Sequence, residues 1–292
     1  MQVMESRRTT LGEDHPCTLS SMGNLAWTYQ RRGRLEEAEK LLVQMTETRK
    51  TMLGENHPDT LTSIGNLASI YRSLGRWTEA EKLEVQVMET HKSTVGEDHP
   101  NTLKSMAVVA SMYREQGRRE EAEKLEMQVM ETRKTKLGED HSDTLTSMDN
   151  LAVTLSKQGR WNDAEKLLMW VMETRKTKLG KDHSDTLTSM GNLAVTLSKQ
   201  GRWNDAEKLL MQVMETRKTK LGENHPDTLT SMATLASTYR SQGRLEEANK
   251  LEVPKVGTSN PTVAEDHLNM IKGASNLSFT WKVPWTKYQR RK

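Results

Sequence analysis

Histidine is the residue type in this chain whose placement most resembles a metal or catalytic site. Imidazole nitrogens bind Zn²⁺ at about 2.0–2.1 Å, so a shared ion needs its ligands side by side. Two predicted helices separate successive copies, which places neighbouring histidines roughly 10 Å or more apart. We therefore predict that the histidines hydrogen-bond backbone groups in the loops before each first helix, and we expect no metal site and no cofactor. The six copies recur every 42 residues, at His15, His57, His99, His141, His183 and His225.

Acidic pairs are the other groups that could perform acid–base chemistry, and Glu13-Asp14 and Glu139-Asp140 are two examples. They lie in the same polar linkers as the histidines, and Lys181 replaces the glutamate in one copy. A solvated loop explains this pattern better than a pair of catalytic carboxylates does. The sequence also shows no nucleophile motif, phosphate-binding loop or dinucleotide fingerprint. These observations predict a protein that is not an enzyme.

Composition limits the remaining classes of function. Of the 292 residues, 34% are hydrophobic and 4% aromatic, and the mean hydropathy is −0.79, which is low for a compact domain but expected of a thin stacked core. Lys and Arg number 43 against 40 Asp and Glu, so the net charge of +3 does not indicate nucleic-acid binding. Cys17 is the single cysteine, which excludes an internal disulfide. No apolar run approaches the roughly 18 residues of a membrane helix, and no secretory signal begins the chain. We expect a cytoplasmic protein without membrane contact.

The elements that position these residues form a repeat. A fixed period between 20 and 50 residues indicates a solenoid, in which each unit buries its apolar face only by stacking on its neighbours. Such a protein presents a long surface rather than a pocket, which favours binding over catalysis. Two columns with the same 42-residue step are Gly33, Gly75, Gly117, Gly159, Gly201 and Gly243, and Ala38, Ala80, Ala122, Ala164, Ala206 and Ala248.

Each unit contains two predicted helices. In the second unit Leu61, Ile64 and Tyr71 lie on one helical stripe, which begins after Pro58 and stops before Gly75. This first helix should be about 15 residues long, and a second helix of about 17 residues should follow it. Alanines recur on both helices, where small side chains let two backbones approach. The predicted fold class is all-α, built from antiparallel helix pairs.

The order of Ala68, Tyr71, Gly75 and Ala80 resembles the tetratricopeptide repeat, although the period is 42 rather than about 34 residues and the closing proline is missing. The segment LGENHPDTLTSIGNLASIYRSLGRWTEAEKL is similar to the longer repeats of kinesin light chains. It is closer still to the kinesin-light-chain-like arrays of fungal NLR-type (NB-ARC/NACHT) proteins. The phrases QVMETRK and HPDTLTSM support this resemblance. It implies a right-handed superhelical solenoid whose concave face, lined by the first helices, binds another polypeptide.

The resemblance also suggests how the chain is divided. Residues 1–10 match the end of a second helix, so they are expected to be the remnant of a preceding repeat. Residues 11–253 form six repeats. Residues 254–292 lose the pattern and begin with Pro254, so a disordered tail is expected there. We expect the array to be part of a larger polypeptide or complex.

Variation among the copies indicates a possible binding face on the first helices. Three variable columns are spaced by four and then three residues, which suggests a common face, and a neighbouring column is rich in asparagine. Amides suit the donors and acceptors of an extended peptide, and arginines imply an acidic or carboxylate-bearing partner. The alternative is drift on a solvated face. The candidate partner-binding residues are Asn24, Trp27, Asn66, Arg72, Arg114, Asp149, Asn150, Asn192 and Arg240.

The fourth and fifth units, residues 130–171 and 172–213, are nearly identical. They differ only at Glu139/Lys181, Asp149/Gly191 and Trp170/Gln212. Such identity implies recent duplication, which suits a recognition surface under diversification. The sequence therefore predicts a protein-interaction scaffold or sensor module of a fungal NLR-like signalling protein. The alternative is a kinesin-light-chain-type cargo adaptor of a microtubule motor, which requires an upstream heptad segment.

Overall fold

The computed structural model describes residues 2–252, and this part of the chain contains thirteen α-helices and no β-strand. After α1, each of the six units consists of a first helix and a second helix. The first helices are α2 (Pro16–Arg31), α4 (Pro58–Ser73), α6 (Pro100–Glu115), α8 (Ser142–Lys157), α10 (Ser184–Lys199) and α12 (Pro226–Ser241). The others are α1 (Gln2–Leu11), α3 (Leu35–Leu53), α5 (Trp77–Val95), α7 (Arg119–Leu137), α9 (Trp161–Leu179), α11 (Trp203–Leu221) and α13 (Leu245–Glu252).

The residues at the helix ends explain where the helices begin and end. His57 caps α4, because its Nδ1 accepts a hydrogen bond from the backbone N–H of Asp59 at 3.1 Å, and Pro58 follows as the first helical residue. The other five histidines cap their first helices in the same way, which confirms the predicted backbone role. At the end of α5, Gly96 has φ 95° and ψ 161°, a conformation that is essentially restricted to glycine. The first and second helices of this unit have 16 and 19 residues, slightly more than predicted.

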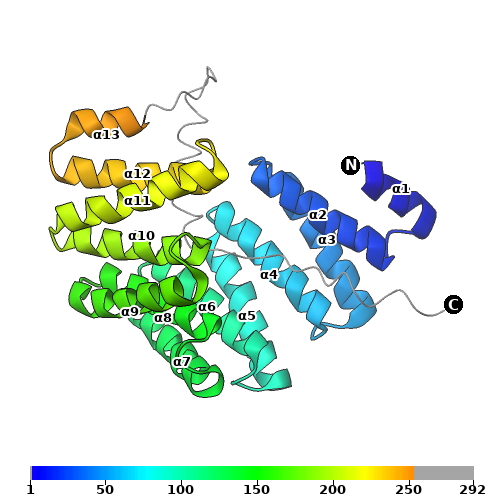
Figure 1. Ribbon diagram of the computed structural model, residues 1–292. Helices are drawn as coiled ribbons and strands as arrows, with labels where there is room; N and C mark the ends of the chain where they lie inside the picture. The colour runs from blue at the N-terminus through cyan, green and yellow to red at the C-terminus, as the bar shows by residue number, and fades with distance from the viewer. Residues whose placement is uncertain (1, 253–292) are drawn as a thin grey trace.

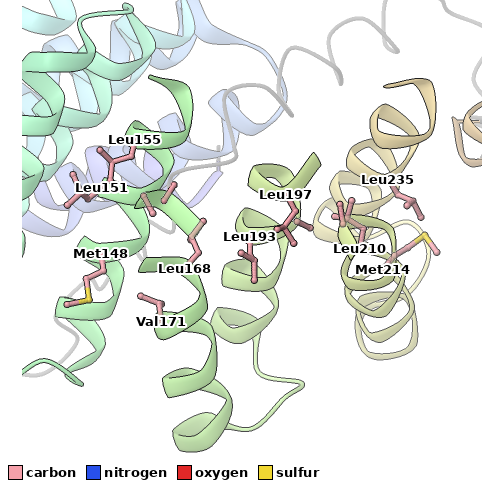
Figure 2. Packing of buried hydrophobic residues seen from close by; sticks show 14 of the residues in the cluster. Met148, Leu151, Leu155, Leu168, Val171, Leu193, Leu197, Leu210, Met214 and Leu235 are labelled. Atoms are coloured by element: carbon pink, nitrogen blue, oxygen red, sulfur yellow. The ribbon is translucent and has the colours of Figure 1, made fainter. Parts of the chain in front are cut away.

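The core lies between the helices, in five clusters spread along the described part of the chain, rather than in a central sphere. Each first helix packs against its own second helix and against the second helix of the preceding unit. Leu151, Leu168, Leu193, Leu210 and Leu235 illustrate the largest cluster, which passes through successive units without a break (Figure 2). The alanine columns lie at the helix crossings, where Ala164 and Ala206 are fully buried. This confirms that their role is close packing.

The pairs stack in sequence order into an open, curved array, with α1 and α13 at opposite ends (Figure 1). From α6 to α12, consecutive first helices touch one another, as α6 does with α8, and α8 does with α10. Consecutive second helices do not approach each other as closely in the described part of the chain. The first helices therefore lie on the inside of the curve and the second helices on the outside. The predicted all-α superhelix of tetratricopeptide type is confirmed.

Helix α1 packs against α2 and occupies the place of a second helix. Met4 is its buried residue, and it joins the cluster that contains Leu19 and Leu42. The predicted tail at 254–292 lies outside the described residues, as do residues 1 and 253. Among the helices of residues 2–252, we find none that combines the length and the apolarity needed to span a membrane.

Ala164→Trp should destabilise the array by about 1–3 kcal/mol, because a large side chain overpacks a closed helix crossing. Deletion of residues 172–213, one whole unit, should instead leave a shorter array that still folds, because neighbouring units share equivalent interfaces. Circular dichroism during thermal unfolding measures both effects. A deletion that unfolds the array, together with a tryptophan variant of unchanged melting temperature, would contradict the modular description.

Candidate functional site

One stripe of side chains on each first helix remains accessible on the inside of the curve. We call it the inner stripe. In the fifth unit it consists of Thr188, Asn192, Val195 and Lys199, at positions i, i+4, i+7 and i+11 of α10. The equivalent positions of the other units, at steps of 42 residues, are exposed or half-buried except for Ser111. The stripes of six first helices therefore form one surface that runs along the array.

The inner stripe contains the predicted asparagine column and Trp27. Asn24 is exposed, while Asn66, Asn150 and Asn192 are half-buried. Trp27 is 42% exposed, and the guanidinium group of Arg31 lies 5.2 Å from its ring centroid. Side-chain amides that repeat along a surface present donors and acceptors to an extended peptide backbone. This part of the predicted site is therefore brought together by the fold.

Basic residues end the inner stripe in three units. Arg31, Lys157 and Lys199 are exposed at the last turns of α2, α8 and α10. Partial burial, with the nearby positive charge of Arg114, lowers the pKa of Lys157. Glu115 occupies the same position in the third unit, but its carboxylate is bound to Arg72. The accessible charge of these positions is thus positive.

The predicted arginines Arg72 and Arg114 lie off the inner stripe and are used inside the array. Arg72 Nη2 donates to Glu115 Oε2 at 2.8 Å, which joins the second unit to the third. Arg114 is 2% exposed; its Nη1 donates to Glu126 Oε1 at 2.7 Å and to the backbone oxygen of Asn150 at 3.3 Å. These two guanidinium groups therefore hold repeats together. Arg240, the third predicted arginine, is exposed at the end of α12.

The arginine column varies together with a column on the second helix, twelve residues further along, whose members in the first five units are buried. Units with Arg72 or Arg114 carry Glu84 or Glu126, and the last unit repeats the pair as Arg240 and Glu252. Burial, partly offset by the neighbouring arginine, raises the pKa of both Glu84 and Glu126 to about 7. The exchange of a charged pair for an uncharged one explains this variation without any ligand. The units without arginine have the pairs Gln30 with Leu42, Ser156 with Leu168, and Ser198 with Leu210.

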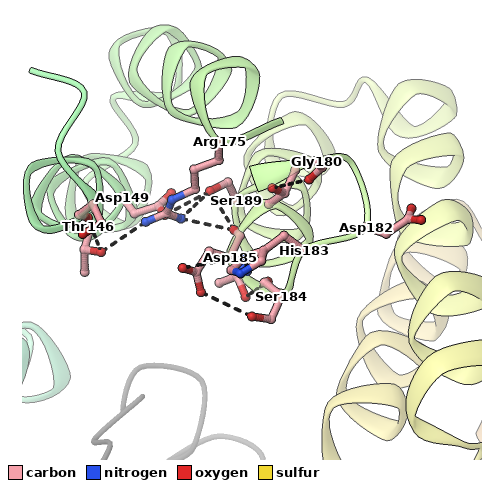
Figure 3. A network of polar contacts seen from close by, with 12 residues as sticks. Thr146, Asp149, Arg175, Gly180, Asp182, His183, Ser184, Asp185 and Ser189 are labelled. Atoms are coloured by element: carbon pink, nitrogen blue, oxygen red, sulfur yellow. Dashed lines mark hydrogen bonds and ion pairs between the residues drawn. The ribbon is translucent and has the colours of Figure 1, made fainter. Parts of the chain in front are cut away.

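Asp149 belongs to a second internal network, between the fourth and fifth units (Figure 3). Its carboxylate forms an ion pair with Arg175 and accepts a hydrogen bond from Ser189 Oγ at 3.1 Å. Asp149 is 6% exposed, and burial raises its pKa although Arg175 opposes the shift. The amide of Asn192 lies close enough to interact with the same carboxyl group. Asp149 is therefore an internal residue, and Asn192 and Thr146, whose Oγ1 accepts a hydrogen bond from Arg175 Nη2 at 3.2 Å, connect this network to the inner stripe.

The sequence analysis did not predict a set of arginine–glutamate ion pairs between successive repeats. In the second to sixth units, the arginine that follows the turn glycine binds a glutamate of the preceding second helix; Arg76 Nη1, for example, donates to Glu39 Oε1 at 2.7 Å. It also forms an ion pair with Glu79, and its guanidinium group lies 4.2 Å from the ring centroid of Tyr71. The signal was present in the sequence, because this arginine is unchanged in all six copies: Arg34, Arg76, Arg118, Arg160, Arg202 and Arg244.

Fold and site together define an α-helical repeat protein with an extended inner surface. Models of the tetratricopeptide repeat match residues 59–135 and 185–252, and a second such model matches residues 18–59 and 144–185. Together they cover most of the described chain, and the chain belongs to the tetratricopeptide repeat family. A search of curated proteins gave no match.

Solved structures of related architecture agree with this assignment. Nearly identical TPR-like repeats of a kinesin-light-chain-like protein from Podosopora anserina are 31% identical, with a TM-score of 0.59 over 69% of this chain and 95% of that chain. A signal transduction ATPase with a tetratricopeptide repeat sensor from Pyrococcus horikoshii is 14% identical, with a TM-score of 0.60 over 94% of this chain and 41% of that chain. A Rap protein in complex with competence and sporulation factor is 9% identical, with a TM-score of 0.62 over 94% and 76%. The last two similarities concern the fold alone.

Proposed function

We propose that this chain is a non-enzymatic binding module that holds an extended peptide or protein segment along its inner stripe. The observation on which the proposal rests is the column formed by Asn66, Asn150 and Asn192. It remains accessible on the inside of the curve, beside first-helix positions that are buried in the core. Side-chain amides that hydrogen-bond to the main chain of a peptide place few demands on the peptide's sequence. Selectivity among peptides then comes from the variable residues beside the asparagines, such as Trp27.

We further propose that the partner is acidic. Arg72 and Arg114 are used internally, so they do not contribute to this preference. Lys157, Lys199 and Arg31 provide the positive charge instead. Attraction between these exposed groups and carboxylates should decrease with salt, because exposed charges are screened beyond about 10 Å at 0.1 M ionic strength.

Two biological settings fit such a module. A sensor array within an NLR-like signalling protein is our first proposal, and the repeat sensor of the Pyrococcus horikoshii ATPase is its structural parallel. A cargo adaptor of the kinesin-light-chain type is the second, and the 31% identity to the Podosopora anserina repeats favours it. Mapping the 5′ end of the transcript distinguishes them, because an upstream nucleotide-binding domain supports the first and sustained heptads support the second.

The test is a fluorescence-polarisation screen of acidic, neutral and basic 12-residue peptides against the purified chain. We expect the tightest binder to be acidic. The double change Asn150→Ala and Asn192→Ala should weaken it at least tenfold, and Lys157→Glu with Lys199→Glu should remove the preference for acidic peptides. Lys82→Glu, on the outer surface of α5, is the control and should have no effect. Binding that survives the inner changes but is lost in the control would refute the assignment to the inner stripe.

A further inference from the structure

The outer surface of the array carries an apolar patch that neither the core nor the inner stripe uses. Met127, Met169 and Met211 are 46%, 49% and 44% exposed on α7, α9 and α11, the second helices of three successive units. Trp170, next to Met169, is 36% exposed. We call these four residues the outer Met–Trp patch. Contiguous exposed apolar side chains mark interaction surfaces, and methionine adapts its shape to a partner.

Trp170 is the residue that sets the fourth unit apart on this surface. The same position is glutamine in the first, second, third and fifth units, as Gln44, Gln86, Gln128 and Gln212. A glutamine there is compatible with the fold, since those units have the same helix boundaries. The packing of the helices therefore does not require a tryptophan at this position. Tryptophan is enriched among the residues that contribute most of the binding energy at protein interfaces.

Charges lie on both sides of the patch in a regular arrangement. On α9, Lys166 precedes Met169 by three residues and Glu173 follows it by four, so all three lie on one helix face. Both are exposed, as are the equivalent residues of α7 and α11, namely Lys124, Glu131, Lys208 and Glu215. The surface thus presents a basic row, an apolar row and an acidic row. The two charged rows lie at similar distances from the apolar row between them.

This arrangement is complementary to itself. Consider a second copy related to the first by a two-fold axis that runs along the array and passes through Trp170. In the second copy the helices run in the opposite direction. The basic row of each copy then faces the acidic row of the other, and the two apolar rows meet. Two-fold interfaces use the same patch on both partners, which is what these rows allow. We propose that the outer Met–Trp patch binds a second copy of this chain, with Lys166 facing Glu173 of the second copy.

The expected dimer is weak. The patch lies on three second helices of a convex surface, with a first helix packed between each successive pair, and two convex surfaces touch only near their centres. The buried area then falls below the roughly 1,200 Å² typical of stable complexes. We expect a dissociation constant on the order of 10–100 μM. The surface pair between Glu173 and Lys176, 3.2 Å apart, is solvent-exposed and leaves the glutamate accessible.

Sedimentation velocity of the full chain between about 1 and 500 μM tests the proposal. We expect the average mass to rise with concentration from the monomer value of 33.3 kDa toward twice that value. Trp170→Gln, which reproduces the residue of the fifth unit, should weaken association at least tenfold while the circular dichroism melting curve stays unchanged. Lys166→Glu alone should also weaken it, and Lys166→Glu combined with Glu173→Lys should restore it.

A monomer at every concentration overturns the proposal. A dimer that Trp170→Gln leaves unchanged, or a charge reversal that the double variant does not rescue, overturns it as well. The peptide affinity of the inner stripe should be the same in Trp170→Gln and in the unaltered chain, so each surface is tested independently of the other.

Discussion

Glu126→Leu should destabilise the array by about 3–5 kcal/mol, whereas the same substitution at the equivalent Glu84 should leave its stability unchanged or raise it. Glu126 is 3% exposed and binds Arg114, which is 2% exposed, at 2.7 Å. Removal of this carboxylate leaves a guanidinium group in the core without its ion-pair partner. A buried charge that loses its counter-charge costs far more than the pair contributed.

Glu84 differs from Glu126 because Arg72, the arginine of the same unit, donates its side-chain hydrogen bond to another residue. Arg72 binds Glu115 at 2.8 Å and retains this partner when Glu84 is replaced. Glu84 is 5% exposed with a pKa raised to about 7, so its carboxylate costs stability near neutral pH. A leucine at this position is already present in three other units, as Leu42, Leu168 and Leu210, where it is buried.

Urea denaturation followed by circular dichroism measures both variants. The control is the double change Arg114→Ser and Glu126→Leu, which installs the pair found as Ser156 and Leu168 in the fourth unit. It should recover most of the stability that Glu126→Leu loses. Equal losses in the two single variants would show that Arg72 depends on Glu84 as much as Arg114 depends on Glu126.

Arg175→Leu should cost about 3–5 kcal/mol, and Arg217→Leu, at the same position of the next unit, only about 1 kcal/mol. Both arginines donate to a serine hydroxyl and a backbone carbonyl of the following first helix, to Ser189 and Ser231 respectively. The fourth unit adds Asp149, buried beside Arg175, where the fifth unit has Gly191. The difference between the two losses therefore isolates the buried carboxylate.

The loss in Arg175→Leu should also depend on pH. Burial already raises the pKa of Asp149 from its ordinary 3.8, and removal of Arg175 raises it further. A folded-state pKa above the unfolded value means that stability is present at low pH and is lost as the pH rises through the folded pKa. Chemical denaturation at pH 5 and pH 8 should give a larger deficit at pH 8 for Arg175→Leu. Arg217→Leu should show no such change, and a deficit that is independent of pH in both variants would contradict a buried charge at Asp149.

The repeat, the helix boundaries and the alanine crossings could be predicted because they depend on local backbone preferences that recur six times. His57, Pro58 and Gly96 fix helix ends through their own geometry, wherever the neighbouring units lie. Ala164 indicates a helix crossing because only a small side chain fits where two helices approach closely. The same local pattern is why the histidines could be expected to hydrogen-bond backbone groups before each first helix.

Only the tertiary structure decided which variable residues face solvent. At about 100° per residue, the columns of Asp149 and Arg114 lie about 80° from the centre of the inner stripe, still on the same half of the helix. The next unit packs against that edge, so Arg114 and Asp149 are buried with Glu126 and Arg175. Asn150 and Asn192 remain accessible. A single sequence shows that both sets vary along the array, but the boundary between them is set by how closely neighbouring repeats approach.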